Sequence, residues 1–328
     1  MHINRRACGF ALAIIAFSLA IAAHAQQFPS KPITIVLGFS AGGATDSALR
    51  TVSEKASLIL GTPIIFEYRP GANQTIAIRK LLEAKPDGYT LLGGTGSSLA
   101  QNPGMQKDLG YDPTKDFTPV ASIGLGPGVL DVNSKLPIQS VAELIEYAKK
   151  NDGALNYGSG GFGTASHLAM EAFMAITGTK MIHVPLKSDT EVALEVSEGR
   201  IDVAFQTLQA VDAYVKSGAI RILAVTSVEE MQSAKGLPTL TATGVAGLDA
   251  LDPYTFYGIV GPRGMPSETV NKLNEAFNKA LADPDVRDRL QNILKVEPKP
   301  DTQEGFGSYV AEQLAKWRKL SQAVQISR

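Results

Sequence analysis

Residues 38–42, Gly-Phe-Ser-Ala-Gly, spell G-x-S-x-G, the pattern around the nucleophilic serine of α/β-hydrolases. A β-branched run precedes the pattern and a helical segment follows it, which is the context that such a nucleophile needs. Only His167 and His183 lie downstream of Ser40 as candidate bases. Hydrolases of this kind place the serine well into the sheet, whereas Ser40 follows the first predicted strand. The sequence therefore disfavours hydrolysis, and an exported serine hydrolase using Ser40 is the alternative.

Residues 158–163, Gly-Ser-Gly-Gly-Phe-Gly, form a second glycine-rich loop that matches G-x-G-x-x-G. In a dinucleotide-binding unit, an acidic residue about twenty positions further on ends the second strand. The candidate, Asp189, comes instead after the run 183–188. We therefore do not interpret the loop as a nucleotide site, and we expect no cofactor.

The two loops share a simpler chemistry. Each follows a predicted strand and leads into a helix whose first turn is polar. We expect Thr45 and Asp46 to cap the first helix, and Thr164 and Ser166 to cap the second. Unpaired N–H groups at a helix N-terminus, with the helix dipole, can bind an anion without a cationic side chain. Two such loops facing each other would hold a small carboxylate, although each loop alone could be merely a tight turn. A third glycine-rich loop, 93–103, contains Thr95, Gly96 and Ser97 after another strand.

β-Rich runs alternate with helical segments along the chain, which predicts parallel sheets joined by βαβ crossovers. The predicted strands are 33–39, 64–68, 90–94, 155–158, 181–184, 201–205 and 220–226. The predicted helices include 45–60, 141–150, 165–177, 191–198 and one that begins after Ser267 as N-cap. Two extended segments, 119–132 and 221–227, are interpreted as crossings between two α/β lobes.

The first 25 residues resemble a cleavable secretory signal: two arginines, an uncharged apolar stretch too short for a membrane anchor, and Ala-His-Ala. Cleavage would remove Cys8, the only cysteine, and would change the formal net charge from −1 to −3. No basic run suits a nucleic acid, and no clustered side chains have the spacing of metal ligands. We therefore expect an exported protein without disulfides, nucleic-acid partner or metal.

Motifs over the whole exported part of the chain resemble one family. They are FPSKPITIVLGFSAGGATDSALR, EYRPGA, KPDGYTLL, YDPTKDFTPVASIG, YGSGGFGTASHLAMEAF, HVPLK, GRIDVAF, IRILAVTS and GPRGMPSETVNKLNEAF. Their order and spacing resemble the periplasmic receptors of tripartite tricarboxylate transporters, also called Bug proteins. The resemblance implies an α/β, type II periplasmic-binding-protein-like fold, with lobe 1 formed by residues 26–122 plus 226–328 and lobe 2 by 123–225.

The resemblance also implies a function and a set of site residues. Such a receptor is no enzyme; as a monomer in the periplasm it closes its lobes on a di- or tricarboxylate and delivers it to membrane transporter subunits. A carboxylate sensor that contacts a signalling partner is the alternative that the sequence leaves open. His167 would steady the second loop from its helix. The implied ligand-binding residues are Phe39, Ser40, Ala41, Gly42, Gly43, Asp46, Thr95, Gly96, Ser97, Ser159, Gly160, Gly163, Thr164, His167, Gln206 and Thr207.

Several positions depart from the family pattern. Proline is usual at Gly38, asparagine at Tyr68, and an Asp-Asn-like pair at Gln206 and Thr207. The departures are Gly38, Tyr68, Asn73, Gln74, Leu186, Ser188, Gln206 and Thr207. The two glycine loops, 39–43 and 158–164, which would form the carboxylate cradle, are therefore expected to be intact. The far end of the pocket is expected to be altered. The loss of acidic character at Gln206 and Thr207 favours a second carboxylate over an amine in the ligand.

Overall fold

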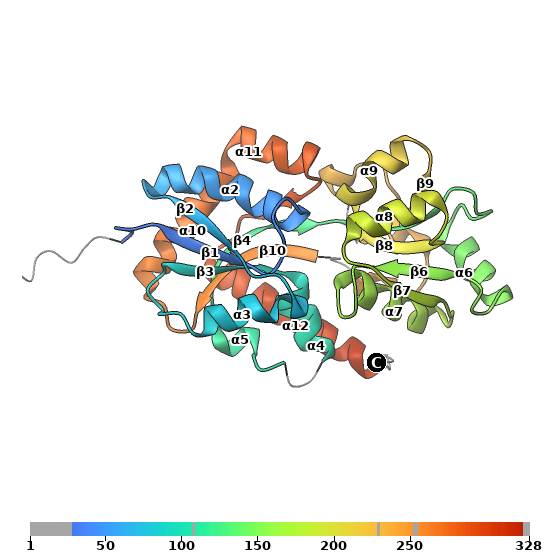
Figure 1. Cartoon of the computed structure of the whole chain (residues 1–328), viewed down its shortest axis with the longest axis horizontal. Coiled ribbons are helices and arrows are strands. Elements are labelled where there is room, and N and C mark those ends of the chain that lie inside the picture. Colours follow the sequence, from blue (N-terminus) through green and yellow to red (C-terminus); the bar gives the residue numbers. More distant parts are fainter. Residues whose placement is uncertain (1–27, 107–108, 228–229, 252–254, 324–328) are drawn as a thin grey trace, which may run out of the picture.

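The computed structural model describes residues 28–106, 109–227, 230–251 and 255–323. The predicted signal segment and Cys8 lie outside these residues. Two β-sheets, each flanked by helices, lie side by side along the longest axis of the molecule (Figure 1). Among the described residues, no helix is both long and apolar enough to cross a bilayer.

The first sheet has six strands in the order β11-β4-β10-β3-β1-β2. β1, β2 and β3 are parallel, and Ile35 pairs with Phe66 and Leu91 on its two sides. β10 runs antiparallel to β3 on one side and to β4 on the other. The strands are β1 (Ile33–Leu37), β2 (Ile64–Tyr68), β3 (Thr90–Thr95), β4 (Phe117–Gly126), β10 (Thr255–Pro262) and β11 (Glu297–Pro298).

The second sheet has five strands in the order β7-β6-β8-β5-β9. Strands β7, β6 and β8 are parallel, and β5 runs antiparallel to its neighbours β8 and β9. The strands are β5 (Gly128–Asn133), β6 (Asn156–Ser159), β7 (Ile182–Pro185), β8 (Val203–Thr207) and β9 (Ile220–Val225). Only Pro127 separates β4 from β5, so the chain passes from one sheet to the other within the predicted crossing 119–132.

Helices cover both faces of each sheet because the strands are buried on both sides. The alternation in β1 shows this: Ile33, Ile35 and Leu37 pack with α2 and α10, whereas Val36 packs into the opposite cluster with α3. Around the first sheet lie α2 (Ala44–Leu60), α3 (Thr75–Leu82), α4 (Asn102–Met105), α5 (Pro113–Asp116), α10 (Ser267–Ala282), α11 (Pro284–Asp288) and α12 (Gln303–Ala323). Around the second lie α6 (Val141–Lys150), α7 (Ala165–Thr177), α8 (Asp189–Glu198) and α9 (Leu208–Lys216).

Short helical turns connect several of these elements. They are η1 (Ala72–Gln74), η2 (Ser97–Gln101), η3 (Gln232–Ala234), η4 (Thr241–Thr243), η5 (Leu248–Leu251) and η6 (Arg289–Ile293). η3 to η5 follow β9. Leu240 donates its N–H to the carbonyl of Val225, and Leu248 is buried in the cluster that contains Phe173 of α7, whereas Ser233 of η3 donates its N–H to Glu297 of β11 in the first sheet. The lobe boundaries stay a prediction.

The predicted elements are present, with three differences. The sheets are mixed, because the strands that carry the chain between them run against their parallel neighbours. α10 begins at Ser267 itself, with Pro266 as its N-cap. The prediction of a third glycine-rich loop over 93–103 is wrong, because β3 extends to Thr95 and helical turns begin directly after Gly96.

Glycines explain the error at the third loop. A Cβ at Gly93 would lie 2.3 Å from Leu37 Cδ2, and a Cβ at Gly94 would lie 2.7 Å from Leu99 Cδ1. These two glycines therefore permit close packing inside a buried strand, and they do not mark a flexible loop.

Candidate functional site

The two helices that follow the glycine loops, α2 and α7, begin without a side-chain cap hydrogen bond, as α3, α4, α9 and α10 also do. The N-caps are Gly43 for α2 and Thr164 for α7, and neither makes a side-chain cap hydrogen bond. By contrast, Ser140, Ser188 and Asp283 cap α6, α8 and α11 through their side chains. The first N–H groups of α2 and α7 lack helical partners and face out of the helix along its dipole. This pair of helix starts is the candidate anion site.

The expectation that Thr45, Asp46, Thr164 and Ser166 cap these helices is wrong. Asp46 accepts a hydrogen bond from the N–H of Gly42 (2.8 Å), and the Ser166 hydroxyl accepts one from the N–H of Gly160 (3.1 Å). Both side chains therefore tie the preceding loop to the helix and leave the N–H groups of the helix uncapped.

Asp46 is a buried anchor for the first loop. Its Oδ1 accepts hydrogen bonds from the Tyr68 hydroxyl (2.8 Å) and from Arg50 (3.2 Å), while Oδ2 holds Gly42. Gly42 has φ +82°, a left-handed conformation that suits glycine. Tyr68, a departure from the family pattern, thus supports the loop through Asp46.

The predicted residues of the first loop are the accessible part of the site. Phe39 is half-buried, and Ser40, Ala41, Gly42 and Gly43 are exposed. The two histidines have other partners, because His167 bonds Gly163 and His183 bonds Ser159. Ser40 therefore lacks the histidine base that a nucleophile requires.

Hydroxyl groups of the second loop form hydrogen bonds to the backbone of the same loop. The Thr164 hydroxyl donates to the Gly161 carbonyl (2.7 Å), and the N–H of Gly161 donates to the Ser159 hydroxyl (3.1 Å). Ser159 is fully buried, whereas Gly160 and Thr164 are partly accessible. Of the predicted residues in this loop, Gly160 and Thr164 are therefore the ones that a ligand can reach.

Two stacked histidines lie behind the second loop. The rings of His167 and His183 are 4.5 Å apart, and His183 also stacks on Tyr157 at 4.8 Å. The N–H of Gly163 donates to Nδ1 of His167 (3.1 Å), which requires that nitrogen to be unprotonated. Burial lowers the pKa of His167; burial and the neighbouring His167 lower the pKa of His183 to about 4. Neutral imidazoles therefore hold the loop at physiological pH.

The third predicted segment is buried and bonded internally. Thr95 accepts a hydrogen bond from Gln74 Nε2 (2.9 Å), and the Ser97 hydroxyl donates to Gln101 (3.2 Å). A Cβ at Gly96 would lie 3.3 Å from the ring of Phe256. This segment nevertheless links the two sheets, because η2 contacts α7. Its residues support the site from behind the first loop.

Two departures from the family pattern contact each other beside the first loop. A Cβ at Gly38 would lie 2.6 Å from Cβ and Cγ of Gln74 and 2.8 Å from its Cα. A proline at this position would place a Cβ in the same space. Gln74 is buried with φ +70°, and its Oε1 has no hydrogen-bond partner among the described residues. Gly38 therefore makes room for Gln74.

The sequence missed an acidic group in the second sheet. Gln206 Nε2 donates to both carboxyl oxygens of the fully buried Asp131 (3.1 Å each), and Gln206 Oε1 is buried without a partner in the described part of the chain. Asp189 accepts a hydrogen bond from the N–H of Thr207. Burial raises the pKa of Asp189 to about 6 and that of Asp131 well above its usual range.

This end of the site therefore carries carboxyl groups, and the expectation of a second carboxylate drawn from Gln206 and Thr207 stays a prediction. The signal that could have revealed them is an aspartate inside the apolar strand Gly-Val-Leu-Asp-Val. The other departures in this region are structural: Ser188 caps α8, and Leu186 packs into an apolar cluster.

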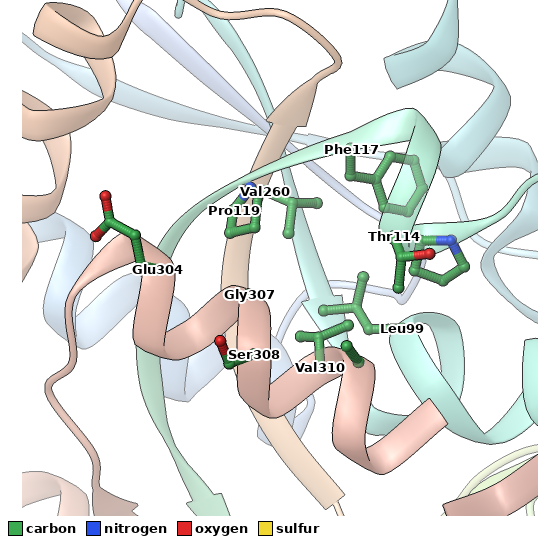
Figure 2. Close-up of a pocket in the computed structure, with 11 residues that line it drawn as sticks. Leu99, Thr114, Phe117, Pro119, Val260, Glu304, Gly307, Ser308 and Val310 are labelled. Carbon is green, nitrogen blue, oxygen red and sulfur yellow. The ribbon is translucent and has the colours of Figure 1, made fainter. Parts of the chain in front are cut away.

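A cavity of about 380 Å³ lies elsewhere, between α12 and the first sheet (Figure 2). None of the predicted site residues lines it. Its walls are mostly apolar, with Phe117, Pro119 and Val260 on the strands and Glu304 and Ser308 on the helix. Among the described residues, no cluster of three or more histidine, cysteine or acidic side chains could hold a metal ion.

Comparisons with known proteins find relatives that match nearly the whole chain. A UPF0065 protein of Bordetella bronchiseptica is 32% identical over 316 residues, which cover 96% of this chain and 92% of the relative. Protein BugT of Bordetella pertussis is 27% identical over 97% of this chain and 96% of its own length.

Two solved structures from Rhodopseudomonas palustris have the same fold. Rpa4515 with adipate is 31% identical, with a TM-score of 0.80 over 90% of this chain and 98% of that one. MatC with bound malate is 27% identical, with a TM-score of 0.79 over 90% of this chain and 100% of that one. The family model described as tripartite tricarboxylate transporter family receptor matches residues 48–326. The chain belongs to this family of receptors.

Proposed function

We propose that this protein is an extracytoplasmic solute-binding receptor that holds a small organic carboxylate, of the di- or tricarboxylate class, between its two sheets. The observation that carries the proposal is the pair of uncapped helix starts at α2 and α7, which come from different sheets and follow the two glycine loops. The relatives with adipate and malate support a carboxylate as the ligand.

The binding residues follow from what is accessible and polar. The N–H groups of the first loop and of the α2 start, with Thr164 and the α7 start, surround the carboxylate. Asp46, Ser159, Gly163 and His167 hold the two loops in position. Backbone N–H groups on a charged oxygen make strong hydrogen bonds, so no arginine is needed.

The receptor works by closure. We assign lobe 1 to residues 26–122 plus 226–328 and lobe 2 to 123–225, so a ligand held by α2 and α7 contacts both lobes. Contacts made only in the closed state shift the population toward that state. The closed, liganded monomer then delivers its solute to the membrane subunits of a tripartite transporter, after export through a signal peptide formed by residues 1–25. It catalyses no reaction.

A thermal-shift screen of residues 26–328 against mono-, di- and tricarboxylates, amino acids and NAD tests the proposal. A ligand at a hundred times its dissociation constant stabilises the folded state by about 2.7 kcal/mol, which raises the melting temperature by a few degrees. We expect a selective shift with one carboxylate class. No shift with any carboxylate, or ester hydrolysis that Ser40→Ala abolishes, would contradict the proposal.

A further inference from the structure

We propose that Asp189, with the Asp131–Gln206 pair behind it, recognises a hydrogen-bond donor on the bound carboxylate, either a hydroxyl or an ammonium group. The inference rests on the proposed function and narrows its ligand class. It assigns a role to three side chains that the carboxylate cradle does not use.

Asp189 lies where the second glycine loop meets the other sheet. A Cβ at Gly160 would lie 3.4 Å from Asp189 Oδ1, so the carboxylate faces the loop directly. Burial raises the pKa of Tyr257 on β10 of the first sheet, and the nearby charge of Asp189 raises it further. Tyr257 pairs with Thr95, at the carboxyl end of β3, next to the strand that leads into the first loop. Asp189 therefore belongs to the same interlobe region as the cradle.

Apart from the N–H of Thr207, which donates to Asp189, the polar side chains assigned to this set offer acceptor oxygens. The amide of Gln206 contacts Asp131, and its Oε1 is fully buried with no partner among the described residues. Burial and the neighbouring Asp189 raise the pKa of Asp131, and neither carboxyl group has a cationic partner among the described residues. Buried polar atoms are normally paired, so the unpaired Gln206 oxygen leaves this set incomplete, while the partly exposed Asp189 can be reached by a donor.

A donor on the ligand would complete the set. The amide and carboxyl oxygens can accept from a hydroxyl or an ammonium group, whereas a second carboxylate against Asp189 would be repelled. A hydrogen bond to a charged group changes affinity by roughly tenfold to a hundredfold. We therefore expect hydroxy- or amino-substituted carboxylates to bind more tightly than unsubstituted ones.

Calorimetric titration at pH 7.5 with two matched series tests the inference. One series is succinate, malate and aspartate; the other is adipate, 2-hydroxyadipate and 2-aminoadipate. Within a series, we expect the hydroxy or the amino acid to bind at least tenfold more tightly than the parent, and the better of the two identifies the donor. Asp189→Asn should reduce that preference to less than threefold without weakening the parent. Asp212→Asn, on the outer helix α9, is the matched control and should leave every affinity unchanged.

Two results would overturn the inference: equal affinities within each series, or a preference that survives both Asp189→Asn and Asp131→Asn. The first comparison uses the wild-type protein alone, so it stands even if a variant does not fold. Absence of binding by all six compounds also contradicts it. If the unsubstituted parents bind, the proposed function still holds. Only a thermal-shift screen in which no carboxylate binds would contradict both the proposed function and this inference.

Discussion

Gly38→Ala is expected to destabilise the protein through one identified steric conflict. The new Cβ would lie 2.6 Å from Cβ and Cγ of Gln74 and 2.8 Å from its Cα. Gln74 cannot easily move aside, because it is buried and its Nε2 is bonded to Thr95. Overpacking of a rigid site costs typically about 1–3 kcal/mol, and two side-chain contacts plus one backbone contact place this substitution near 3 kcal/mol. The melting temperature should fall by roughly 6 °C or more.

A double-mutant cycle with Gln74→Gly isolates the conflict. This second change removes the Cβ and Cγ that collide and suits the left-handed backbone at position 74, but it loses the bond to Thr95. Urea unfolding of the four proteins should show Gly38→Ala to be at least about 1 kcal/mol less harmful in the Gln74→Gly background. Gly43→Ala is the control in the same loop, since the nearest atom to its Cβ lies 3.8 Å away. Additive effects within about 0.5 kcal/mol would refute the steric reasoning.

Three further predictions concern the loops and their supports. Gly42→Ala should reduce the free energy of unfolding by about 1 kcal/mol more than Gly43→Ala, since φ is +82° at Gly42 and −75° at Gly43; urea unfolding of both variants checks this. Tyr68→Phe should cost about 1 kcal/mol in the same assay, because Asp46 loses a hydrogen-bond donor. The folded pKa of His183 is about 4, below the unfolded value, so stability is lost as the pH falls through the unfolded pKa. Between pH 6.5 and 5 the free energy of unfolding should fall more in the wild type than in His183→Phe, by at most about 2 kcal/mol. Urea titrations of both proteins at several pH values would measure this difference.

The pH comparison requires the variant, because Asp189 acts in the opposite direction. Its pKa is raised to about 6 in the folded state, so it takes up a proton there at a pH at which the unfolded chain stays ionised. Its protonation therefore adds stability as the pH falls through 6. The difference between wild type and His183→Phe removes this contribution. An unchanged pH dependence in the variant would mean that His183 is not held neutral by its surroundings.

Most of the secondary structure was predictable because local patterns determine it. Helices 141–150 and 165–177 and strand 64–68 were predicted with their observed bounds, since each combines a clear hydrophobic period with a polar or glycine residue at its end. Glycines were less informative. Gly93 marks close packing against Leu37 and Leu49 from distant segments, and Gly94 marks close packing against Leu99 in the turn that follows the strand; both contacts depend on the folded chain.

The positions of the glycine loops could be predicted from the sequence, whereas the tertiary contacts around the site could not. The glycine patterns located the starts of α2 and α7, but the direction in which Asp46 and Ser166 bond depends on the folded turn. Asp131 and Gln206 are 75 residues apart and meet only through the antiparallel register of β5 and β8. No local period brings such a pair together.

The departures from the family pattern are therefore explained by the contacts that these residues make. Gly38 opens the space that Gln74 fills, and Gln206 bonds the aspartate on the neighbouring strand. Tyr68 bonds Asp46, which holds the first loop. In each case the exchanged residue contacts a group beside the cradle, while the uncapped helix starts are unchanged. Changes at these positions would leave carboxylate binding in place. They would alter which chemical groups the pocket prefers on the rest of the ligand. Selectivity, measured within a matched ligand series, is accordingly the property most sensitive to these positions.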